Sequence, residues 1–390
     1  MDSKLIVLIY SFGFNYSHIL EYPHGHGGYV FDCRGLPNPG RQKEFQEYSG
    51  LDKPVVDYLE VCPEVHRFYH LTLELVKSHC EAFSARGLEH LMVSYGCTGG
   101  QHRSVYMAER MKRDLALAGF KTDCIHKERF RWDIAFAQPC RKAFILAAGL
   151  GTRLLPLTKE VPKALIKLGE EAVIDVVSKK LIEAGVKEIA VNTHYLSEQV
   201  ETHLKNTHLN CNFTTVHEPE LLDTGGGLKN TEGFWGSEPF FIHNVDIISE
   251  TDLRTVYRYH LASKSMVTLV LRERLSTNYF VVDSINIVCG LYYSQKGLID
   301  IRRQPKGPVR YLAFSGIHVI SPEIFKEIKE TGKFSIISLY LRLIEEGFLI
   351  SAYIDNGQFF TDIGNPEGLK RAAEWLSESK SCIFSSKSPV

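Results

Sequence analysis

The stretch KAFILAAGLGTRLLPLTKEVPKAL, residues 142–165, decides the fold. It opens with a short apolar run, Ala143–Leu146, of the kind that forms a buried strand, and a loop of small residues follows at once. A buried strand that leads into a glycine-containing loop is the usual start of an α/β domain. We therefore predict that a domain begins near Lys142, with a ligand-binding loop after its first strand.

The loop itself has the composition of a phosphate site. Its small residues let the backbone approach a ligand closely, and the N–H groups that follow can cradle phosphate oxygens. Arg153 adds a permanent cation with fork geometry, and Lys163 adds a second cation one loop later. The alternative is a tight turn with incidental charges. The predicted phosphate-binding residues here are Ala147, Ala148, Gly149, Gly151, Thr152 and Arg153.

Two better-known phosphate loops are excluded by the spacing. No Gly-Lys-Ser/Thr follows, so the loop is not a Walker A motif. Leu154 stands where the third glycine of Gly-x-Gly-x-x-Gly belongs, so it is not a dinucleotide fingerprint either. However, the pattern G-x-G-T-R-x-x-P-x-T-x-x-x-P-K is intact over Gly149–Lys163. In this respect the chain resembles the sugar-1-phosphate nucleotidyltransferases, over roughly residues 142–375.

That resemblance implies a fold and a set of site residues. The fold is α/β, with a Rossmann-like (glycosyltransferase-A-type) domain built on a mixed, mostly parallel central sheet. HEPELLDTGGGLKN (residues 217–230) resembles the segment that reads the base, with Thr224, Gly225 and Gly226 in contact with the nucleotide. FFIHNVDI (240–247) and FTDIGNPEGL (360–369) resemble the motifs that carry the two metal-binding aspartates, here Asp246 and Asp362. The implied catalytic residues are Arg153, Lys163 and Asp246.

The chemistry explains these residue types. A sugar-phosphate oxygen attacks the α-phosphorus of a nucleoside triphosphate, and pyrophosphate leaves. Two highly charged anions must meet, so the site needs positive charge more than it needs a base. Mg²⁺ held by the two aspartates would neutralise the developing charge. Taken alone, each aspartate would be typical of a turn or a helix cap.

The sugar and the base are less clearly indicated. The segments Leu222–Gly227 and Phe314–Phe325, and an ending soon after Asp-Ile-Gly-Asn-Pro-Glu, resemble N-acetylmuramate-1-phosphate uridylyltransferases. The Glu-Lys-Pro motif of many glucose- and mannose-1-phosphate enzymes is missing. Asn192–Val200, however, also occurs in mannose-1-phosphate guanylyltransferases, which remain the alternative. Ser276–Tyr293 matches no pattern clearly, and Val245 stands where glycine is usual. We expect UTP and N-acetylmuramate 1-phosphate as substrates.

A separate phosphate-binding domain is predicted before Lys142. LMVSYGCTGGQHRSVYMAERM (residues 91–111) has the pattern of a strand, a loop and a helix. The helix N-terminus, with His102 and Arg103, should attract an anion. Cys97 to Arg103 is also Cys-x₅-Arg followed by serine, the layout of a cysteine-dependent phosphatase loop with a low-pKa thiol. The alternative is a Cys97 that simply packs at the strand end.

The first domain also resembles the C-terminal domain of the RNase adapter family RapZ. The resemblance lies in SFGFNY (11–16), FDCRGLPNPG (31–40), GLDKPV (50–55) and GCTGGQHRSV (96–105). It implies a sensor that binds glucosamine 6-phosphate and also contacts RNA and protein partners. The implied phosphate-site residues are Thr98, Gly99, Gly100, Gln101, His102 and Arg103, with His26, Asp32 and Arg34 nearby.

RNA binding is kept open but is not favoured. Residues 1–138 carry 16 Lys and Arg against 17 Asp and Glu, whereas RNA-binding domains are usually clearly basic. The counter-argument is a local group of cations, Arg110, Lys112, Arg113, Lys121, Lys127, Arg129 and Arg131. In the non-enzymatic alternative, the first domain is an RNA or protein adapter and the second a regulator that binds a nucleotide sugar. A fused sensor and enzyme would adjust activated-sugar synthesis to precursor supply.

Composition sets the remaining limits. With 390 residues and 44% hydrophobic residues, the chain has enough material for two domains, which we place at 1–138 and 141–380, with a flexible tail at 381–390. The net charge of −1 draws it to neither nucleic acid nor an anionic membrane. Nine cysteines without a Cys-x-x-Cys pair favour a reducing, cytoplasmic compartment. His24 and His26 lack a matching pair at zinc spacing, so no structural metal is expected there.

Hydrophobic periodicity and turn residues predict the elements. The expected strands are Leu5–Tyr10, Tyr29–Arg34, Leu91–Tyr95, Glu188–Asn192, Phe240–His243 and Met266–Leu271. The expected helices are Pro54–Leu59, Phe68–Ala85, Ser104–Ala118, Ile174–Ala184 and Asp252–Ser263.

Overall fold

The computed structural model describes residues 5–16, 27–133, 138–355 and 359–385. The chain divides into two compact units, one made of Met1–Ala137 with Lys306–Pro308 and the other of Gln138–Pro305 with Val309–Val390. Each unit is described by itself. Within the described ranges, no helix combines the length and apolar character needed to cross a bilayer.

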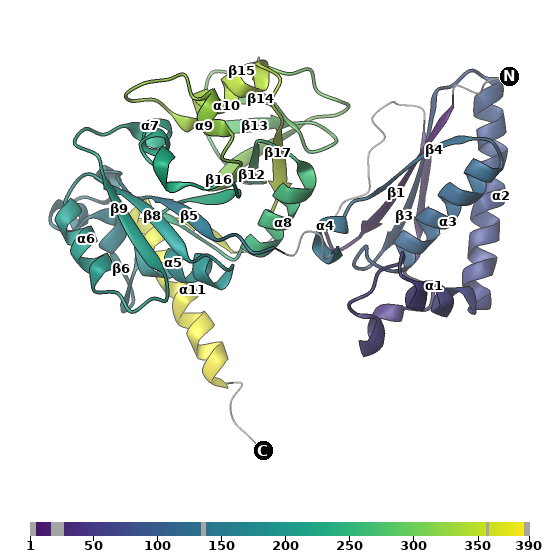
Figure 1. Cartoon of the computed structure of the whole chain (residues 1–390), viewed down its shortest axis with the longest axis horizontal. Helices are drawn as coiled ribbons and strands as arrows, with labels where there is room; N and C mark the ends of the chain where they lie inside the picture. Colours follow the sequence, from purple (N-terminus) through teal and green to yellow (C-terminus); the bar gives the residue numbers. More distant parts are fainter. Residues whose placement is uncertain (1–4, 17–26, 134–137, 356–358, 386–390) are drawn as a thin grey trace. The chain divides into compact units, whose positions relative to one another are not determined.

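The first unit is a small parallel sheet with helices packed on it (Figure 1). Its sheet order is β2-β3-β1-β4, and every pairing is parallel. The helices α2 and α3 pack against the sheet and against each other. The bounds are β1 Ile6–Gly13, β2 Gly28–Asp32, α1 Lys53–Glu60, α2 Pro63–Ala85, β3 His90–Cys97, α3 Arg103–Leu117, β4 Lys121–His126 and α4 Arg129–Trp132.

The order of these strands predicts at which edge of the sheet a ligand binds. The chain goes from β3 through α3 to β4, which lies on the other side of β1. Ligands in open α/β sheets bind outside the carboxyl ends of the strands at such a switch point. The loop that follows Cys97 lies there, and Gly13 at the end of β1 packs so closely on it that a Cβ would come within 2.7 Å of the Gly99 carbonyl carbon.

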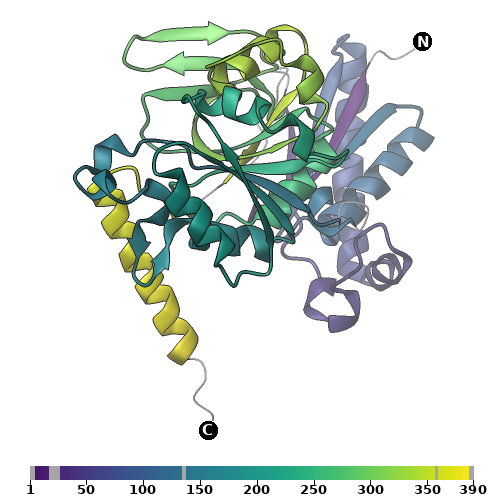
Figure 2. The same ribbon diagram turned by 60° about the vertical axis from the view of Figure 1, so that its left-hand side comes forward.

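The second unit is built on a ten-stranded mixed sheet. The strands β10, β5, β8 and β9 lie side by side and parallel, and from β16 onward the path β16-β13-β14-β15 is antiparallel. The α/β class and the mixed sheet are confirmed, with the parallel part in the half that carries the first loop. Figure 2 shows the hairpin of β14 and β15 (light green) projecting at the sheet edge, and the helix α11 (yellow) extending from the unit.

The elements of the second unit follow in chain order. They are β5 Lys142–Leu146, β6 Lys167–Leu168, β7 Glu171–Ala172, α5 Val173–Glu183, β8 Glu188–Thr193, α6 Ser197–Lys205, β9 Asn212–His217, α7 Asp223–Lys229, β10 Phe240–Asn244, β11 Ile247–Ser249, α8 Leu253–Ser263, β12 Val267–Arg272, β13 Asn278–Val282, β14 Val288–Tyr293, β15 Leu298–Ile301, β16 Arg310–Ile320, α9 Ile324–Glu327, α10 Ile336–Glu345, β17 Ile350–Ile354, β18 Phe360–Asp362 and α11 Pro366–Ser385.

Each unit has its own apolar core. Apolar residues of β1, β3, α2 and α3 are buried together in the first, and those of β10, β12, β16 and α10 in the second. The helix predicted to begin at Phe68 begins at Pro63 instead, because proline is tolerated in the first turn, where its missing N–H is not needed. The helix α11 continues to Ser385, inside the stretch 381–390 whose flexibility stays a prediction.

Candidate active site

The loop after β5 has the tight backbone that its small residues predicted. Gly151 has a φ of +66°, and a Cβ on it would come within 2.7 Å of the Thr158 side chain. Its carbonyl accepts hydrogen bonds from the Thr158 hydroxyl at 2.8 Å and from the Leu154 amide at 2.9 Å. Only glycine adopts this conformation without strain, so the loop geometry depends on Gly151.

A cavity of about 290 Å³ opens at the carboxyl ends of β5 and β10. This is the edge at which parallel α/β sheets bind ligands. Ala147, Ala148 and Gly149 line it, as do Lys163, Thr224 and Asp246. Its other lining residues are Leu146, Asn192, Glu218, Leu221, Asp223, Asn244, Val245 and Lys333.

The four charged residues predicted for catalysis and metal binding converge. Lys163 forms an ion pair with Asp246, and the Arg153 guanidinium lies 3.8 Å from the Asp362 carboxylate. Asp246 and Asp362 are neighbours because Ile247 pairs with Asp362 in the antiparallel β11–β18 ribbon. Lys163 is largely buried, with 10% of its side chain exposed, whereas 64% of the Arg153 side chain is exposed. Arg153 is therefore the freer of the two cations to meet an incoming phosphate.

This donor set fits a hard divalent cation. Carboxylate oxygens are the ligands that Mg²⁺ prefers, usually one or two carboxylates together with substrate phosphates. The side chains of Asp246 and Asp362 are partly exposed, at 19% and 38%. The two carboxylates and their two cations sum to zero charge, so a bound divalent cation would make the site positive and suited to an anionic substrate.

A buried hydrogen-bond relay that the sequence did not reveal holds the loop in place. The Asn192 carboxamide donates to the Glu218 carboxylate at 2.7 Å and accepts from the Ala147 backbone N–H, also at 2.7 Å. Glu218 is fully buried and also accepts from the Leu222 amide at 3.0 Å. The relay joins the ends of β8 and β9 to the first residue of the loop. The relay could have been predicted from the parallel pairing of β8 with β9, which places the two strand ends side by side.

The glycines of the base segment serve packing. The amides of Gly225 and Gly226 donate to the Phe334 carbonyl, at 3.0 and 3.3 Å, and neither glycine lines the cavity. A Cβ on Gly227 would come within 2.7 Å of the Glu218 carboxylate. Thr224 does line the cavity, and its hydroxyl accepts from the Ile336 amide at 3.0 Å. Of the three predicted residues, Thr224 is therefore the one that lines the cavity.

A second cavity, of about 560 Å³, borders Asp362. Three arginines line it, Arg272, Arg274 and Arg371. Arg272 is buried in an ion pair with Asp355 at 2.6 Å, and Arg274 donates to the Phe314 carbonyl at 2.8 Å. Both guanidinium groups lie over the Phe360 ring, 4.4 and 5.3 Å from its centroid. Glu273 and Glu367 also line this cavity.

The predicted phosphate loop of the first unit runs from Thr98 to Arg103, between β3 and α3. Gly100 has a φ of +68°, and Thr98 is exposed. Gln101 donates to the carbonyls of Gln46 and Tyr48, and the His102 ring bonds the Phe45 carbonyl at 2.9 Å. These hydrogen bonds hold the loop against residues 45–48. Both side chains are therefore engaged with backbone carbonyls instead of being directed at an anion.

Arg103 is the buried cation of this loop. One of its terminal nitrogens donates to the carbonyls of Arg34 and Leu36, at 2.9 and 3.0 Å, and the other to the Thr98 hydroxyl at 3.3 Å. Its Nε–H has no hydrogen-bond partner among the described residues, although only 4% of the residue is exposed. A buried donor without a partner costs free energy that a bound acceptor would recover.

Two of the remaining predicted residues of this phosphate site are paired with each other. Asp32 and Arg34 form an exposed bidentate pair at 2.7 Å, and the Arg34 hydrogen bond lowers the pKa of Asp32. The pair presents little net charge to a phosphate. His26 lies outside the described residues.

Cys97 is placed as in the phosphatase layout but is buried. Its sulfur lies 3.1 Å from the Ser104 hydroxyl and accepts from the Gly100 amide at 3.2 Å. Only 3% of the residue is exposed, and Arg103 is bonded to backbone carbonyls as described. A nucleophile must reach its substrate, so the arrangement fits a packed strand end better than a phosphatase.

Several cations of the basic group face acids. Arg110, Lys112, Arg113 and Arg129 form ion pairs with Glu60, Glu109, Asp114 and Asp133, respectively. A nucleic acid phosphate would have to compete with these carboxylates.

Comparison with known proteins agrees with this geometry. A family model described as nucleotidyl transferase matches residues 142–379, and the chain belongs to that family. A model described as the RapZ C-terminal domain matches residues 5–129. The first unit thus matches the model of the RapZ C-terminal domain, and the second unit matches the nucleotidyl transferase model.

Individual relatives cover the two parts separately. An N-acetylmuramate alpha-1-phosphate uridylyltransferase of Caulobacter vibrioides is 28% identical over 251 residues, which is 62% of this chain and 100% of that protein. A nucleotide-binding protein of Acinetobacter baumannii is 39% identical over 131 residues, 34% of this chain. The chain spans 44% of the length of that relative. The RNase adapter protein RapZ of Hamiltonella defensa is 40% identical over 110 residues, 28% of this chain and 37% of that protein.

Solved structures support the fold of the second unit. HddC from Yersinia pseudotuberculosis is 23% identical with a TM-score of 0.50, covering 60% of this chain and 99% of its own. A UDP-glucose pyrophosphorylase from Acinetobacter baumannii is 18% identical with a TM-score of 0.51, covering 64% and 100%. At these identities the likeness concerns the fold alone.

Proposed function

We propose that the chain transfers a uridylyl group from UTP to N-acetylmuramate 1-phosphate and releases pyrophosphate. The observation that carries the proposal is the convergence of Arg153, Lys163, Asp246 and Asp362 beside the cavity at the end of β5. The relative from Caulobacter vibrioides, matched over its whole length, supports the choice of base and sugar.

The residues of the chain would divide the work. Backbone amides of the loop up to Thr152 would bind the triphosphate, and Arg153 would neutralise the leaving pyrophosphate. Lys163 would hold the reacting phosphates from its position beside Asp246. Asp246 and Asp362 would hold Mg²⁺, which when bound supplies positive charge to the phosphates. The acceptor phosphate is already a nucleophile, so no general base is required of the protein.

The arginine-lined cavity favours an acidic sugar. N-acetylmuramate carries a carboxylate that N-acetylglucosamine, glucose and mannose lack. Arg272 is already paired with Asp355, so Arg274 and Arg371 are the lining arginines that could meet the carboxylate, in competition with Glu273 and Glu367, and a guanidinium fork suits a carboxylate. A neutral sugar would not use this charge.

A substrate panel tests the proposal. Purified protein with Mg²⁺ is given UTP, GTP, dTTP or ATP, each with the 1-phosphates of N-acetylmuramate, N-acetylglucosamine, glucose and mannose, and pyrophosphate release is followed. We expect turnover with UTP and N-acetylmuramate 1-phosphate above every other pair. A preference for GTP and mannose 1-phosphate would establish the alternative and overturn the proposed sugar and base. No turnover on any pair would favour the non-enzymatic regulator.

For the first unit we propose binding of an amino-sugar phosphate, with glucosamine 6-phosphate as the probe. The unpartnered Nε–H of buried Arg103, at the start of α3, supports an anion there. Isothermal titration calorimetry should detect binding of glucosamine 6-phosphate and no binding of glucosamine. An Arg103→Gln variant should lose it, and Arg86→Gln, on an exposed arginine at the end of α2, should not. Equal binding by both variants would reject the site.

Two further expectations belong to this proposal. The sensor would adjust the enzyme, so saturating glucosamine 6-phosphate should change the rate or KM of the uridylyl transfer. Unchanged kinetics would reject the coupling.

RNA and protein docking stay the less favoured alternative, to be tested by measuring how the binding of a hairpin RNA depends on salt concentration. The cysteines of the described part are free thiols, which suits the cytoplasm.

A further inference from the structure

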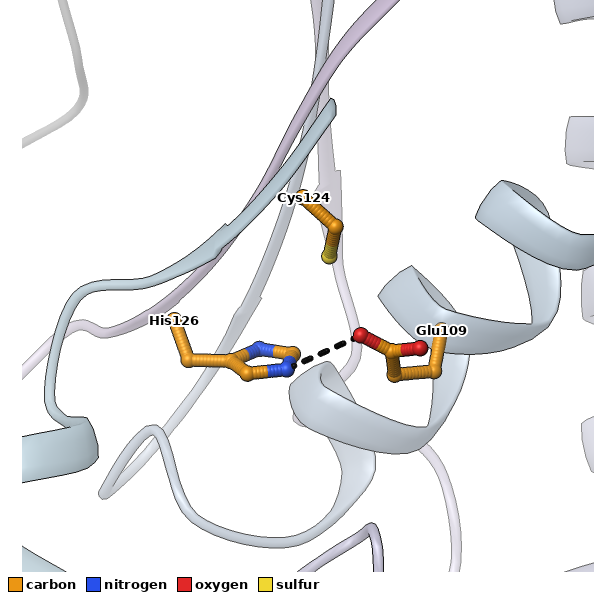
Figure 3. A group of neighbouring side chains, drawn as sticks. All are labelled: Glu109, Cys124 and His126. Atoms are coloured by element: carbon orange, nitrogen blue, oxygen red, sulfur yellow. Dashed lines mark ion pairs between the residues drawn. The ribbon is translucent and has the colours of Figure 1, made fainter. Parts of the chain in front are cut away.

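Three side chains with metal-binding chemistry meet in the first unit, apart from its phosphate loop. Glu109 comes from α3, and Cys124 and His126 come from β4 (Figure 3). Cys124 and His126 are two residues apart on one strand, so their side chains lie on the same face of the sheet. That is the face on which α3 packs.

The potential ligand atoms are mutually close. One atom from each residue can be chosen so that all lie within 4.8 Å of one another. His126 Nε2 lies 3.2 Å from Glu109 Oε1, the pair that the dashed line marks in Figure 3. The Cys124 thiol also interacts with the Glu109 carboxylate. Tetrahedral ligands at zinc-to-ligand distances of roughly 2.0–2.3 Å are separated by less than 4.8 Å, so small side-chain movements would close this set around an ion.

The surroundings orient the ligand atoms. The Ser11 hydroxyl, which is fully buried, lies 2.8 Å from His126 Nδ1 and leaves Nε2 directed at the cluster. Metal-binding histidines usually have such a partner on the second ring nitrogen. Lys112 approaches the other carboxylate oxygen, Oε2, at 3.5 Å, so Oε1 remains on the cluster side.

We propose that Glu109, Cys124 and His126 bind a borderline-soft divalent cation of the Zn²⁺ class. A thiolate and an imidazole select against Mg²⁺ and Ca²⁺, and thiolate, imidazole and carboxylate together are a usual zinc donor set. Three protein ligands leave a fourth position for water or another ligand. The ion would link α3 to β4 across the edge of the sheet. The competing interpretation is a metal-free Glu109–His126 ion pair.

The cluster has an intrinsic optical reporter. The Trp132 ring lies 6.1 Å from the His126 ring, and its indole N–H donates to the Gly100 carbonyl at 3.2 Å. Bound Co²⁺, which has an open d shell, should therefore quench Trp132 fluorescence. The same hydrogen bond connects the cluster to the phosphate loop that contains Gly100.

Cobalt titration of the full metal-free chain tests the proposal. We expect one equivalent of Co²⁺ to produce a thiolate-to-cobalt charge-transfer band and to quench tryptophan fluorescence, and equimolar Zn²⁺ to remove the band. The band separates this site from carboxylate sites such as Asp246 and Asp362, which contain no sulfur. Cys124→Ser should lose the band, while Cys62→Ser, on a half-buried cysteine bonded to the Tyr58 carbonyl, should keep it.

Two more variants make the result decisive. His126→Gln and Ser11→Ala should weaken binding, the latter by about 10- to 100-fold, the usual effect of removing a partner of a metal ligand. Circular dichroism and urea unfolding identify any variant that fails to fold, and the remaining variants then carry the test. A band that persists in Cys124→Ser, or no band in the parent chain at stoichiometric Co²⁺, would overturn the site and leave the ion pair.

Discussion

The backbone N–H of Ile363 donates a hydrogen bond of 2.9 Å to the carbonyl oxygen of Asp246. This bond prolongs the β11–β18 ribbon by one step and ties the two aspartate motifs together, although they are far apart in the sequence. The ribbon brings the partners of the aspartates, Lys163 and Arg153, to the same place.

Removal of either carboxylate should therefore abolish most of the activity. We expect Asp246→Asn and Asp362→Asn each to lower kcat by about 10²–10³-fold, the scale found when one preorganised electrostatic group is removed. Pyrophosphate release at saturating substrates measures the effect. Asp300→Asn, in the edge strand β15, is the control and should remain active. Near-full activity of Asp246→Asn would reject the assignment of the metal site.

The relay of Glu218, Asn192 and Ala147 makes a second prediction. Asn192→Asp would place a second carboxylate against fully buried Glu218, which now accepts from the Asn192 amide. We expect a loss of stability of about 1–3 kcal/mol, as for an unsatisfied buried group, and a raised KM for UTP because repulsion from Glu218 would displace the side chain that accepts from the Ala147 N–H. Urea unfolding and steady-state kinetics measure the two effects.

A double variant checks the mechanism of that prediction. Glu218→Gln added to Asn192→Asp restores a donor opposite the new carboxylate, while the other aspartate oxygen can still accept from Ala147. Stability and KM should both recover in large part. A double variant as impaired as the single one would show that the relay does not position the loop.

Much of this site could be predicted because its signals are local. The loop of Gly149–Lys163 is one continuous pattern, and its residue types indicate the backbone conformation that it adopts. Gly151, for example, stands at a positive φ. Asp246 follows the predicted strand Phe240–His243, and Asp362 was placed by the resemblance of its motif. Their neighbourhood followed from the family resemblance, since no local pattern specifies the β11–β18 pairing.

The rest depends on tertiary contacts that no short pattern specifies. Asn192 and Glu218 meet because β8 and β9 pair in a parallel register, with Asn192 opposite Val216. Arg274 lies after β12, just before the stretch Ser276–Tyr293, where the sequence matched no pattern. Cys124 and His126 meet Glu109 across a helix–strand contact, with no zinc-type spacing in the sequence.

The arginine cavity predicts a selective effect on the acceptor. Arg274→Ala should raise KM for N-acetylmuramate 1-phosphate by roughly tenfold or more, because a charged hydrogen bond to the sugar carboxylate is worth about 1.5–3 kcal/mol. KM for UTP should stay within about twofold, and any slow turnover of N-acetylglucosamine 1-phosphate should be unchanged. Equal losses with both sugars would mean that Arg274 acts on the common phosphate or on the fold.

Buried histidines should make the second unit sensitive to acid. Burial lowers the pKa of His260 and of His318 to about 3 each, whereas a histidine in the unfolded chain titrates near 6.5. Below about pH 6.5 these histidines are therefore protonated in the unfolded state but not in the folded state. The free energy of unfolding consequently decreases as the pH is lowered. By linkage each group should contribute a loss of about 2 kcal/mol between pH 7 and pH 5.

His260 offers the sharper test because burial is the sole cause of its lowered pKa, and both ring nitrogens are bonded, to Thr268 and Ser321. In His260→Gln the loss of unfolding free energy between pH 7 and pH 5, measured by urea titration, should shrink by about 2 kcal/mol. His208→Gln, on an exposed histidine, should leave that difference unchanged. If the two variants behave alike, the acid sensitivity does not come from the buried ring.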